Sequence, residues 1–296
     1  MTDDRRTRTL RQLAWTALLL MLVVTSVSAL LRLTQPRPAC PVWPNCRGNV
    51  VQQIASEQRP GLAAALVVAR AVHRTAASLA LIVVLLLALV ALARRPRNWR
   101  VGGPALALLG LALGLSVLGI VTPGSRANAV LLGNLFGGFL MLAIAWQITQ
   151  RYDSSLDLDV GRRFIWWVLA AAALWMTQAA FGALAGTGRS GLAANVHASL
   201  ALVAALAAYH VGALANRSGL AAIGIAVIAM VFIQWLLGVS AAVLGAPVSV
   251  VLIHNFSAAV VLALLLGLLW RLWELRHTRL RHVTTARDAA VASLRG

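Results

Sequence analysis

The chain has 296 residues, of which 60% are hydrophobic and only 11% are charged. A soluble domain of this length cannot bury so much apolar surface, so the composition excludes an ordinary soluble protein and indicates a protein of the lipid bilayer. The net charge of +18 raises the question of a nucleic-acid partner, but the 26 basic residues are concentrated at alternate ends of apolar segments, as in membrane proteins. We therefore expect membrane lipid as a partner and no nucleic acid.

Eight apolar segments are each long enough to cross a bilayer, which takes roughly 20 residues of helix. They lie at residues 12–33, 62–93, 104–122, 128–149, 164–186, 191–214, 219–243 and 248–272. The first follows a group of arginines, as a signal peptide does, but its apolar run is longer than a signal core, so we expect a retained span. The predicted fold class is an all-α integral membrane protein with eight transmembrane helices.

The arginines also predict an orientation. They cluster before the first segment, between the second and third, around residues 151–163 and after residue 271. Because positive charge marks the cytoplasmic side, both termini are expected in the cytoplasm, in a bacterial plasma (inner) membrane. The loop of residues 34–61 then lies on the opposite, oxidising side.

Segments of the second half of the chain are similar to segments of the first. The run Asn134-Leu-Phe in segment four resembles His254-Asn-Phe in segment eight, and segments two and six share a Val-His pair. We interpret the chain as a duplication of four helices. The N-terminal half is residues 1–150 and the C-terminal half is residues 151–296, with a polar linker between them.

The even-numbered segments carry the residues of most chemical interest, His73, Asn134, His197 and His254. The last three each lie about six residues inside an apolar run, roughly 9 Å along a helix. Histidine in hydrocarbon is costly and usually faces a partner in the bundle interior, and neutral imidazole is a good ligand for heme iron. We favour His197 and His254 as the two ligands of one heme; a hydrogen bond between helices is the alternative.

In the first half the equivalent pair is His73 and Asn134, and an amide is a poor iron ligand. A heme there is at best five-coordinate. Arg70 precedes His73 by three residues and shares its helix face, where it can pair with a heme propionate or extend to the membrane surface.

Two glutamines each precede a glycine by four residues, Gln178 with Gly182 and Gln234 with Gly238. A polar amide and a small residue one turn apart are typical of close-packed membrane helices, so we expect these pairs at helix contacts.

Cys40 and Cys46 are the only cysteines and lie in the loop after the first segment. A disulfide between them closes a very short loop, which stabilises little by chain entropy. Two interpretations remain open: a redox-active pair and a structural bridge.

Residues 40–48, Cys-Pro-x-Trp-Pro-x-Cys-x-Gly, resemble a signature of the heme A synthase family, which acts in cytochrome oxidase assembly. The resemblance extends over nearly the whole chain and includes the pair His73 and Arg74. It implies a cofactor heme b between His197 and His254. It also implies that heme O, the substrate, is oxidised at a methyl group to a formyl beside His73. The implied partners are heme O synthase, oxidase assembly factors and a second copy of the chain in a homo-oligomer.

Two positions depart from the family pattern. The family's second ligand of the substrate heme is a histidine where this chain has Asn134, and its catalytic glutamate corresponds to Arg70. Arginine cannot accept a proton, so it cannot replace a carboxylate in acid–base work. The alternative function is therefore a catalytically lapsed heme b protein that serves oxidase assembly or electron transfer.

Overall fold

The structure is a computed structural model that describes residues 3–34, 60–93, 95–122, 127–150, 161–186 and 191–293. This part of the chain contains eight α-helices and no strands. Each helix is long and apolar enough to cross a bilayer. The chain is thus an all-α, eight-span membrane protein, as the sequence predicts.

The helices follow the predicted segments closely. They are α1 (Asp3–Thr34), α3 (Pro60–Leu92), α4 (Trp99–Val121), α5 (Asn128–Gln150), α6 (Arg162–Ala185), α7 (Gly191–Arg217), α8 (Ala221–Val243) and α9 (Val248–Ser293). The largest differences are at the ends of the chain, where α1 and α9 extend well beyond the apolar runs. Arginine, leucine and alanine are good helix formers, so the helix continues where the hydrophobic pattern stops.

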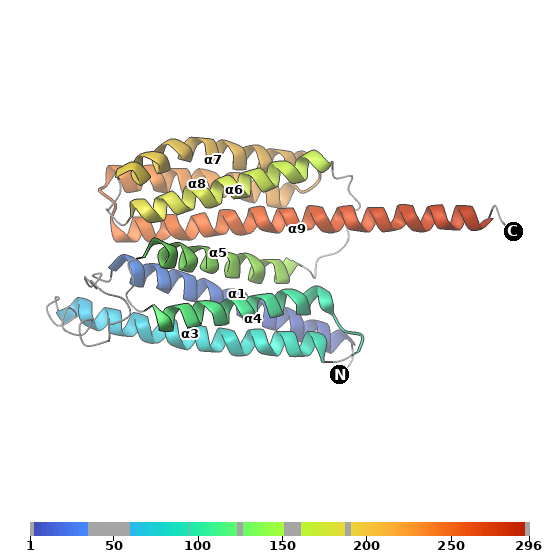
Figure 1. Cartoon of the computed structure of the whole chain (residues 1–296), viewed down its shortest axis with the longest axis horizontal. Coiled ribbons are helices and arrows are strands. Elements are labelled where there is room, and N and C mark those ends of the chain that lie inside the picture. Colours follow the sequence, from blue (N-terminus) through green and yellow to red (C-terminus); the bar gives the residue numbers. More distant parts are fainter. Residues whose placement is uncertain are drawn as a thin grey trace.

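The helices form two groups of four (Figure 1). In the first group α1 contacts α3 and α5, and α4 contacts α3 and α5; in the second, α7 contacts α6 and α8, and α9 contacts α6 and α8. The groups meet chiefly where α9 packs against α5 and α1, with a smaller contact between α5 and α6. Helix α9 therefore belongs to both interiors, and its last turns project beyond the bundle.

The buried face of α9 explains this central position. Leu262, Leu265, Leu268 and Leu272 recur every three or four residues, and their side chains are fully buried. This spacing places them on one face of the helix. Neighbouring helices cover this face along several turns, so packing fixes the position of α9. The residues near its N-terminal end are therefore held in place as well.

Helices α7 and α8 approach each other very closely at two glycines. A Cβ atom on Gly224 would lie 2.6 Å from the carbonyl oxygen of Gly212, which is closer than real Cβ atoms come. Only glycine allows the two backbones to meet here, as is usual where membrane helices cross without a water-driven hydrophobic force.

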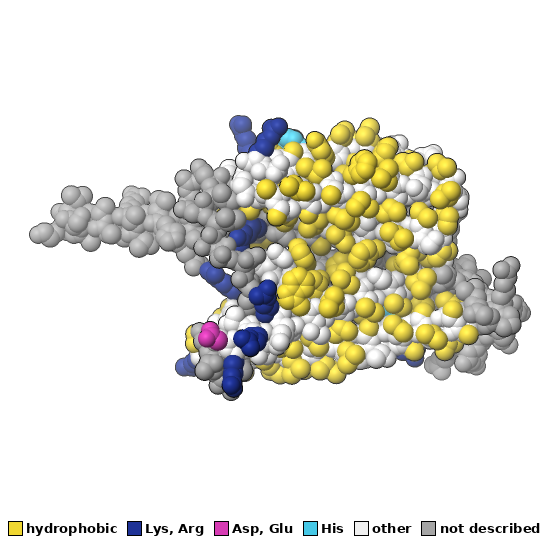
Figure 2. Space-filling view, turned by 180° about the vertical axis from the view of Figure 1, so that it is seen from behind, with side chains coloured by type: hydrophobic (Ala, Val, Ile, Leu, Met, Phe, Trp, Pro, Cys, Tyr) yellow, Lys and Arg dark blue, Asp and Glu magenta, His cyan; other side chains and the backbone are white. Residues whose placement is uncertain are grey.

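The outer surface is that of a bilayer protein. Figure 2 shows apolar side chains over the length of the bundle and most basic side chains at the end from which α9 projects. Exposed tryptophans that lie within a few residues of an arginine in the sequence include Trp15, Trp99, Trp166 and Trp273. Tryptophan favours the interface between lipid and water, so these side chains outline one edge of the membrane-spanning region.

Candidate functional site: two histidines and a neighbouring cavity

Two of the predicted ligands meet in the second group of helices. His197 on α7 and His254 on α9 have ring centroids 6.3 Å apart, with their ring planes nearly perpendicular at 85°. Both side chains are half-buried. Two imidazoles bound to one metal from opposite sides, at about 2.0–2.1 Å from nitrogen to metal, have centroids roughly 6–6.5 Å apart. The observed separation lies in this range, and it is also that of an ordinary edge-to-face contact between two rings.

His197 is tied to α6 by a reciprocal pair of hydrogen bonds. Its Nδ1 lies 3.0 Å from the backbone carbonyl oxygen of Gln178. Because a carbonyl only accepts, Nδ1 carries the proton and donates, which leaves a lone pair on Nε2. In return the Gln178 side-chain amide donates to the carbonyl oxygen of His197 at 2.8 Å. Such a donated Nδ1–H bond is typical of histidines that bind a metal through Nε2.

His254 is held differently, by the side chain of a glutamine on α8. The Nε2 atom of His254 lies 3.1 Å from the amide nitrogen of Gln234. The Gln234 oxygen lies against the Ser257 hydroxyl, one turn further along α9, and this hydroxyl also lies 3.0 Å from the backbone carbonyl oxygen of His254, so its one proton is donated to only one of the two oxygens. Because the amide nitrogen only donates, Nε2 of His254 is the acceptor in this arrangement. The Nδ1 atom of His254 is buried and has no hydrogen-bond partner.

The two glycines lie at helix contacts, as expected, and there they make room for the two imidazole rings. A Cβ atom on Gly182 would lie 2.7 Å from Cε1 of His197, and one on Gly238 would lie 3.2 Å from Cε1 of His254. Each ring therefore packs against the backbone of the preceding helix. The Gln and Gly of each motif thus act on the same histidine, which the sequence interpretation as helix packing did not anticipate.

The pair offers two imidazole rings, the kind of ligand that heme iron takes. Two buried polar atoms beside them, Oε1 of Gln178 and Nδ1 of His254, have no hydrogen-bond partner among the described residues. Nearby, the indole nitrogen of Trp175 donates to the carbonyl oxygen of Ala258 at 3.0 Å, which ties α6 to α9 beside the site. Residues from α6, α7, α8 and α9 together fix the two rings.

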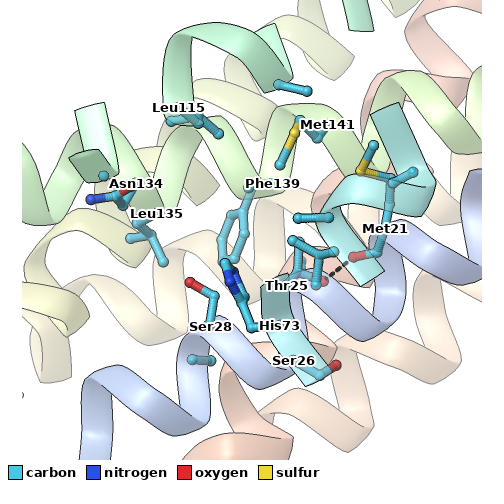
Figure 3. A pocket seen from close by; sticks show the side chains of 18 of the residues that line it. Met21, Thr25, Ser26, Ser28, His73, Leu115, Asn134, Leu135, Phe139 and Met141 are labelled. Atoms are coloured by element: carbon cyan, nitrogen blue, oxygen red, sulfur yellow. Dashed lines mark hydrogen bonds between the residues drawn. The ribbon is translucent and has the colours of Figure 1, made fainter. Parts of the chain in front are cut away.

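His73 and Asn134 both line one cavity, in the first group of helices. Its volume is about 390 Å³, within the usual range for small-molecule sites. Figure 3 shows His73 beside Phe139 and Ser28, with Asn134 on the far side of Leu135. The amide nitrogen of Asn134 donates to the carbonyl oxygen of Val130, one turn back on its own helix. The structure brings these two predicted residues to one cavity without joining them.

Arg70 is half-buried one turn before His73. It is not among the residues that line the cavity, and the lining residues include neither an arginine nor a carboxylate in the part of the chain that is described. A role for Arg70 in pairing with a propionate, or in reaching the membrane surface, stays a prediction.

Hydroxyl groups in the cavity lining were not among the predicted site residues. Thr25, Ser116 and Thr122 each donate to a carbonyl oxygen one turn back on their own helix. Their oxygens therefore remain acceptors towards a ligand. The signal was present in the sequence, since the run Thr-Ser-Val-Ser at residues 25–28 is polar within an apolar span and polar residues inside membranes tend to be functional.

Helix α9 contributes to both sites. His254 belongs to the histidine pair, whereas the next residues, Asn255 and Phe256, line the cavity together with Leu252 and Ala259. Successive residues of a helix are about 100° apart, so one turn of α9 presents side chains to each group of helices. The residue of the histidine pair, His254, and the first of these cavity residues, Asn255, are therefore adjacent in the sequence.

One further histidine of α7 lies apart from the pair, and the two predicted cysteines lie outside the described residues. His210 is exposed and packs edge-on against Trp167, with ring centroids 5.0 Å apart, far from the histidine pair along α7. Cys40 and Cys46 lie outside the described residues, so their disulfide stays a prediction.

Comparison with known proteins adds no assignment: no protein-family model matches the chain, and no characterised protein matches it.

Proposed function

We propose that the chain is a heme A synthase-type membrane protein, which oxidises a methyl group of heme O to a formyl and uses heme b as its cofactor. The observation that supports it most directly is the pair of neutral histidines, His197 and His254, whose rings lie 6.3 Å apart between two helices. The resemblance around Cys40 and Cys46 supplies the reaction class.

His197 would hold heme b through its Nε2 atom, and His254 through a ring nitrogen; its Nε2 atom becomes available when the Gln234 amide, 3.1 Å away, releases it. Heme b supplies one-electron transfer when it is bound. The carbonyl of Gln178 keeps the proton of His197 on Nδ1, and Gly182 and Gly238 keep both rings close to their neighbouring helices.

The cavity in the first group of helices would take the substrate porphyrin beside His73. Its apolar residues, such as Phe139 and Leu135, suit a ring system, and His73 is a candidate ligand for the substrate iron. Oxidising a methyl group to a formyl adds one oxygen atom, from water, and removes four electrons and four protons, so an external electron acceptor must take up the electrons. The reaction proceeds through an alcohol, and the acceptor oxygens of Thr25 and Ser116 suit the hydroxyl of that alcohol.

In the cell, this function belongs to a bacterial plasma (inner) membrane with both termini in the cytoplasm. Heme O is strongly apolar, so it would reach the cavity from the bilayer or directly from heme O synthase. Oxidase assembly factors would receive the product, and a homo-oligomer is a further expected assembly. These partners rest on the resemblance.

The decisive experiment is extraction and chromatography of hemes from the purified protein, expressed with and without a heme O synthase, together with its reduced-minus-oxidised spectrum. We expect heme b in both preparations, and heme A or its hydroxylated precursor only when heme O is supplied. Replacing His197 or His254 by alanine should remove the heme b spectrum. His210→Ala is the matched control, because this histidine is exposed on the same helix as His197.

Absence of heme A and of its precursor, in the presence of heme O, would contradict the synthase activity. Retention of heme b in both histidine variants would contradict the assigned ligands.

A second candidate function is a lapsed heme b protein of oxidase assembly or electron transfer. It is favoured by the cavity lining, which has no carboxylate among the described residues, and by the Asn134 amide, which bonds to its own helix. The double substitution Arg70→Glu with Asn134→His restores the family pattern and should then produce heme oxidation that the unaltered chain lacks. No gain in oxidised heme would contradict a lapsed site.

A further inference from the structure

One face of α9 lines the cavity in the first group of helices. It consists of Leu252, Asn255, Phe256 and Ala259, which follow each other at intervals of three, one and three residues and therefore share one side of the helix. Three of these four residues are apolar, and Asn255 is the polar one. A single polar side chain on an apolar face within the membrane-spanning region either bonds to a neighbouring helix or contacts a ligand.

A bond to a neighbouring helix does not account for Asn255. Among the residues that the structure describes, none forms a hydrogen bond with its side-chain amide. The side chain is half-buried at the cavity, so its N–H groups and its carbonyl oxygen both remain available to a ligand. The amide nitrogen of Asn134, by contrast, donates to its own helix, and the hydroxyls of Thr25 and Ser116 do the same.

We propose that Asn255 is a specificity-determining residue of the cavity, whose amide bonds to the side-chain hydroxyl of heme O and so selects this heme over heme b. The inference rests on the proposed function, which has heme O in the cavity and heme b at the histidine pair. Heme O carries a hydroxyl-bearing isoprenoid chain where heme b carries a vinyl group. A protein that holds both hemes therefore needs a group in the cavity that recognises this substituent.

The chemistry of the amide suits a hydroxyl. A hydroxyl donates and accepts, and an amide answers both, because its oxygen accepts and its nitrogen donates. A heme propionate is charged and needs a cation when it is buried, whereas the described residues of the cavity lining include no arginine. The vinyl group of heme b would cover the Asn255 amide without bonding to it. A site that bonds to a hydroxyl rejects the analogue without one for this reason.

The test compares the two hemes as ligands of the cavity, without requiring turnover. The full-length chain in lipid nanodiscs is first given one equivalent of heme b for the histidine pair. Heme O and further heme b are then titrated separately, and binding is followed by difference absorption spectra. His73→Ala should abolish this second binding event for both hemes, which assigns it to the cavity. In the unaltered chain we expect heme O to bind more tightly than the second heme b.

Asn255→Leu keeps a side chain of similar size and removes its polar atoms. It should weaken the binding of heme O about 3–10-fold, as expected for the loss of one hydrogen bond, and leave the second heme b unchanged. Asn255→Ser retains a group that donates and accepts, so it should keep part of the preference for heme O. The spectrum of the first heme b shows whether each variant is folded.

Asn195→Leu is the matched control, because this asparagine is exposed on α7 and does not line the cavity. It should leave both affinities unchanged. Equal affinities for heme O and heme b in the unaltered chain would overturn selection by Asn255 and leave the proposed function in place. The same holds if Asn255→Leu binds heme O undiminished, or weakens both hemes equally. A chain that binds neither heme in the cavity would contradict the proposed substrate site, and the inference with it.

Discussion

At the scale of single residues, equivalent positions of the internal repeat have different surroundings. Gly238 and Gly114 both follow a leucine in similar runs, yet a Cβ atom on Gly238 would lie 3.2 Å from the His254 ring, whereas one on Gly114 would meet nothing within 4 Å. A side chain at position 238 would therefore crowd the His254 ring, whereas position 114 has room for one. A histidine opposite the glycine makes this difference.

The tightest of these contacts gives a prediction. Gly182→Ala places a Cβ atom 2.7 Å from Cε1 of His197, so the ring must move, and overpacking of this kind costs about 1–3 kcal/mol. We expect a lower midpoint of thermal unfolding and a lower ratio of heme to protein after purification. Gly114→Ala is the control, with unchanged or slightly raised stability because alanine favours helix. Equal behaviour of the two variants would contradict a steric role for Gly182.

At the scale of helices, a few side chains fix how neighbouring elements lie against each other. Trp175 ties α6 to α9 through its bond to the Ala258 carbonyl, and Arg6 ties α1 to the end of α3. Both contacts join helices across the membrane-spanning bundle, where apolar burial alone gives little specificity because lipid is as apolar as the protein.

Trp175→Phe keeps an aromatic ring but removes the donor to Ala258. Because a typical hydrogen bond contributes about 0.5–1.5 kcal/mol, we expect a modest decrease in thermal stability. We also expect an altered heme spectrum, because this part of α9 carries His254. Differential scanning fluorimetry and optical spectroscopy would measure both. Trp167→Phe, at an exposed position on the same helix, should change neither quantity.

Arg6→Gln tests the contact between α1 and α3. The guanidinium donates to the carbonyl oxygens of Val90, Ala91 and Pro96, which includes carbonyls of the last turn of α3. Carbonyls at the end of a helix lack partners within the helix, so Arg6 caps α3. Because the site is only partly buried, we expect a loss of about 1–2 kcal/mol, seen as a lower unfolding temperature.

Arg8→Gln is the control for Arg6, since Arg8 is exposed on the same helix. A decrease in stability that is equal for both variants would indicate a general effect of charge and would contradict the cap.

At the scale of the whole molecule, eight spans and one central helix define the architecture. Helix α9 contacts both groups of helices and contributes His254 to one site and Asn255 to the other. A movement of α9 therefore changes both sites together. This arrangement suits a protein in which a redox cofactor and a substrate must be coupled, the function that we propose.

An even number of spans puts both termini on one side of the membrane, and the arginine pattern predicts that this side is the cytoplasm. Epitope tags at either terminus should be protected from protease in intact spheroplasts, and a tag inserted in residues 34–61 should be cleaved. Cleavage of the terminal tags without permeabilisation would contradict the orientation. Tags that become accessible only after permeabilisation provide the positive control.

The sequence by itself determined the number of spans and their approximate limits. Each span must satisfy its backbone hydrogen bonds internally and present apolar side chains to lipid, so hydropathy along the chain is sufficient. It also identified His197 and His254 as neighbours, because two polar residues at equal depth in apolar spans need a partner.

Only the tertiary structure decided what surrounds these residues. Gln178 and Gln234 each precede a glycine by four residues. The backbone carbonyl of Gln178 bonds to His197, however, whereas the side-chain amide of Gln234 bonds to His254. Similarly, Asn255 lines the cavity of the opposite half. Such contacts depend on the rotation and separation of packed helices. The spacing of apolar residues in a sequence predicts which face of a helix is buried, but not which atoms of the neighbouring helices that face contacts.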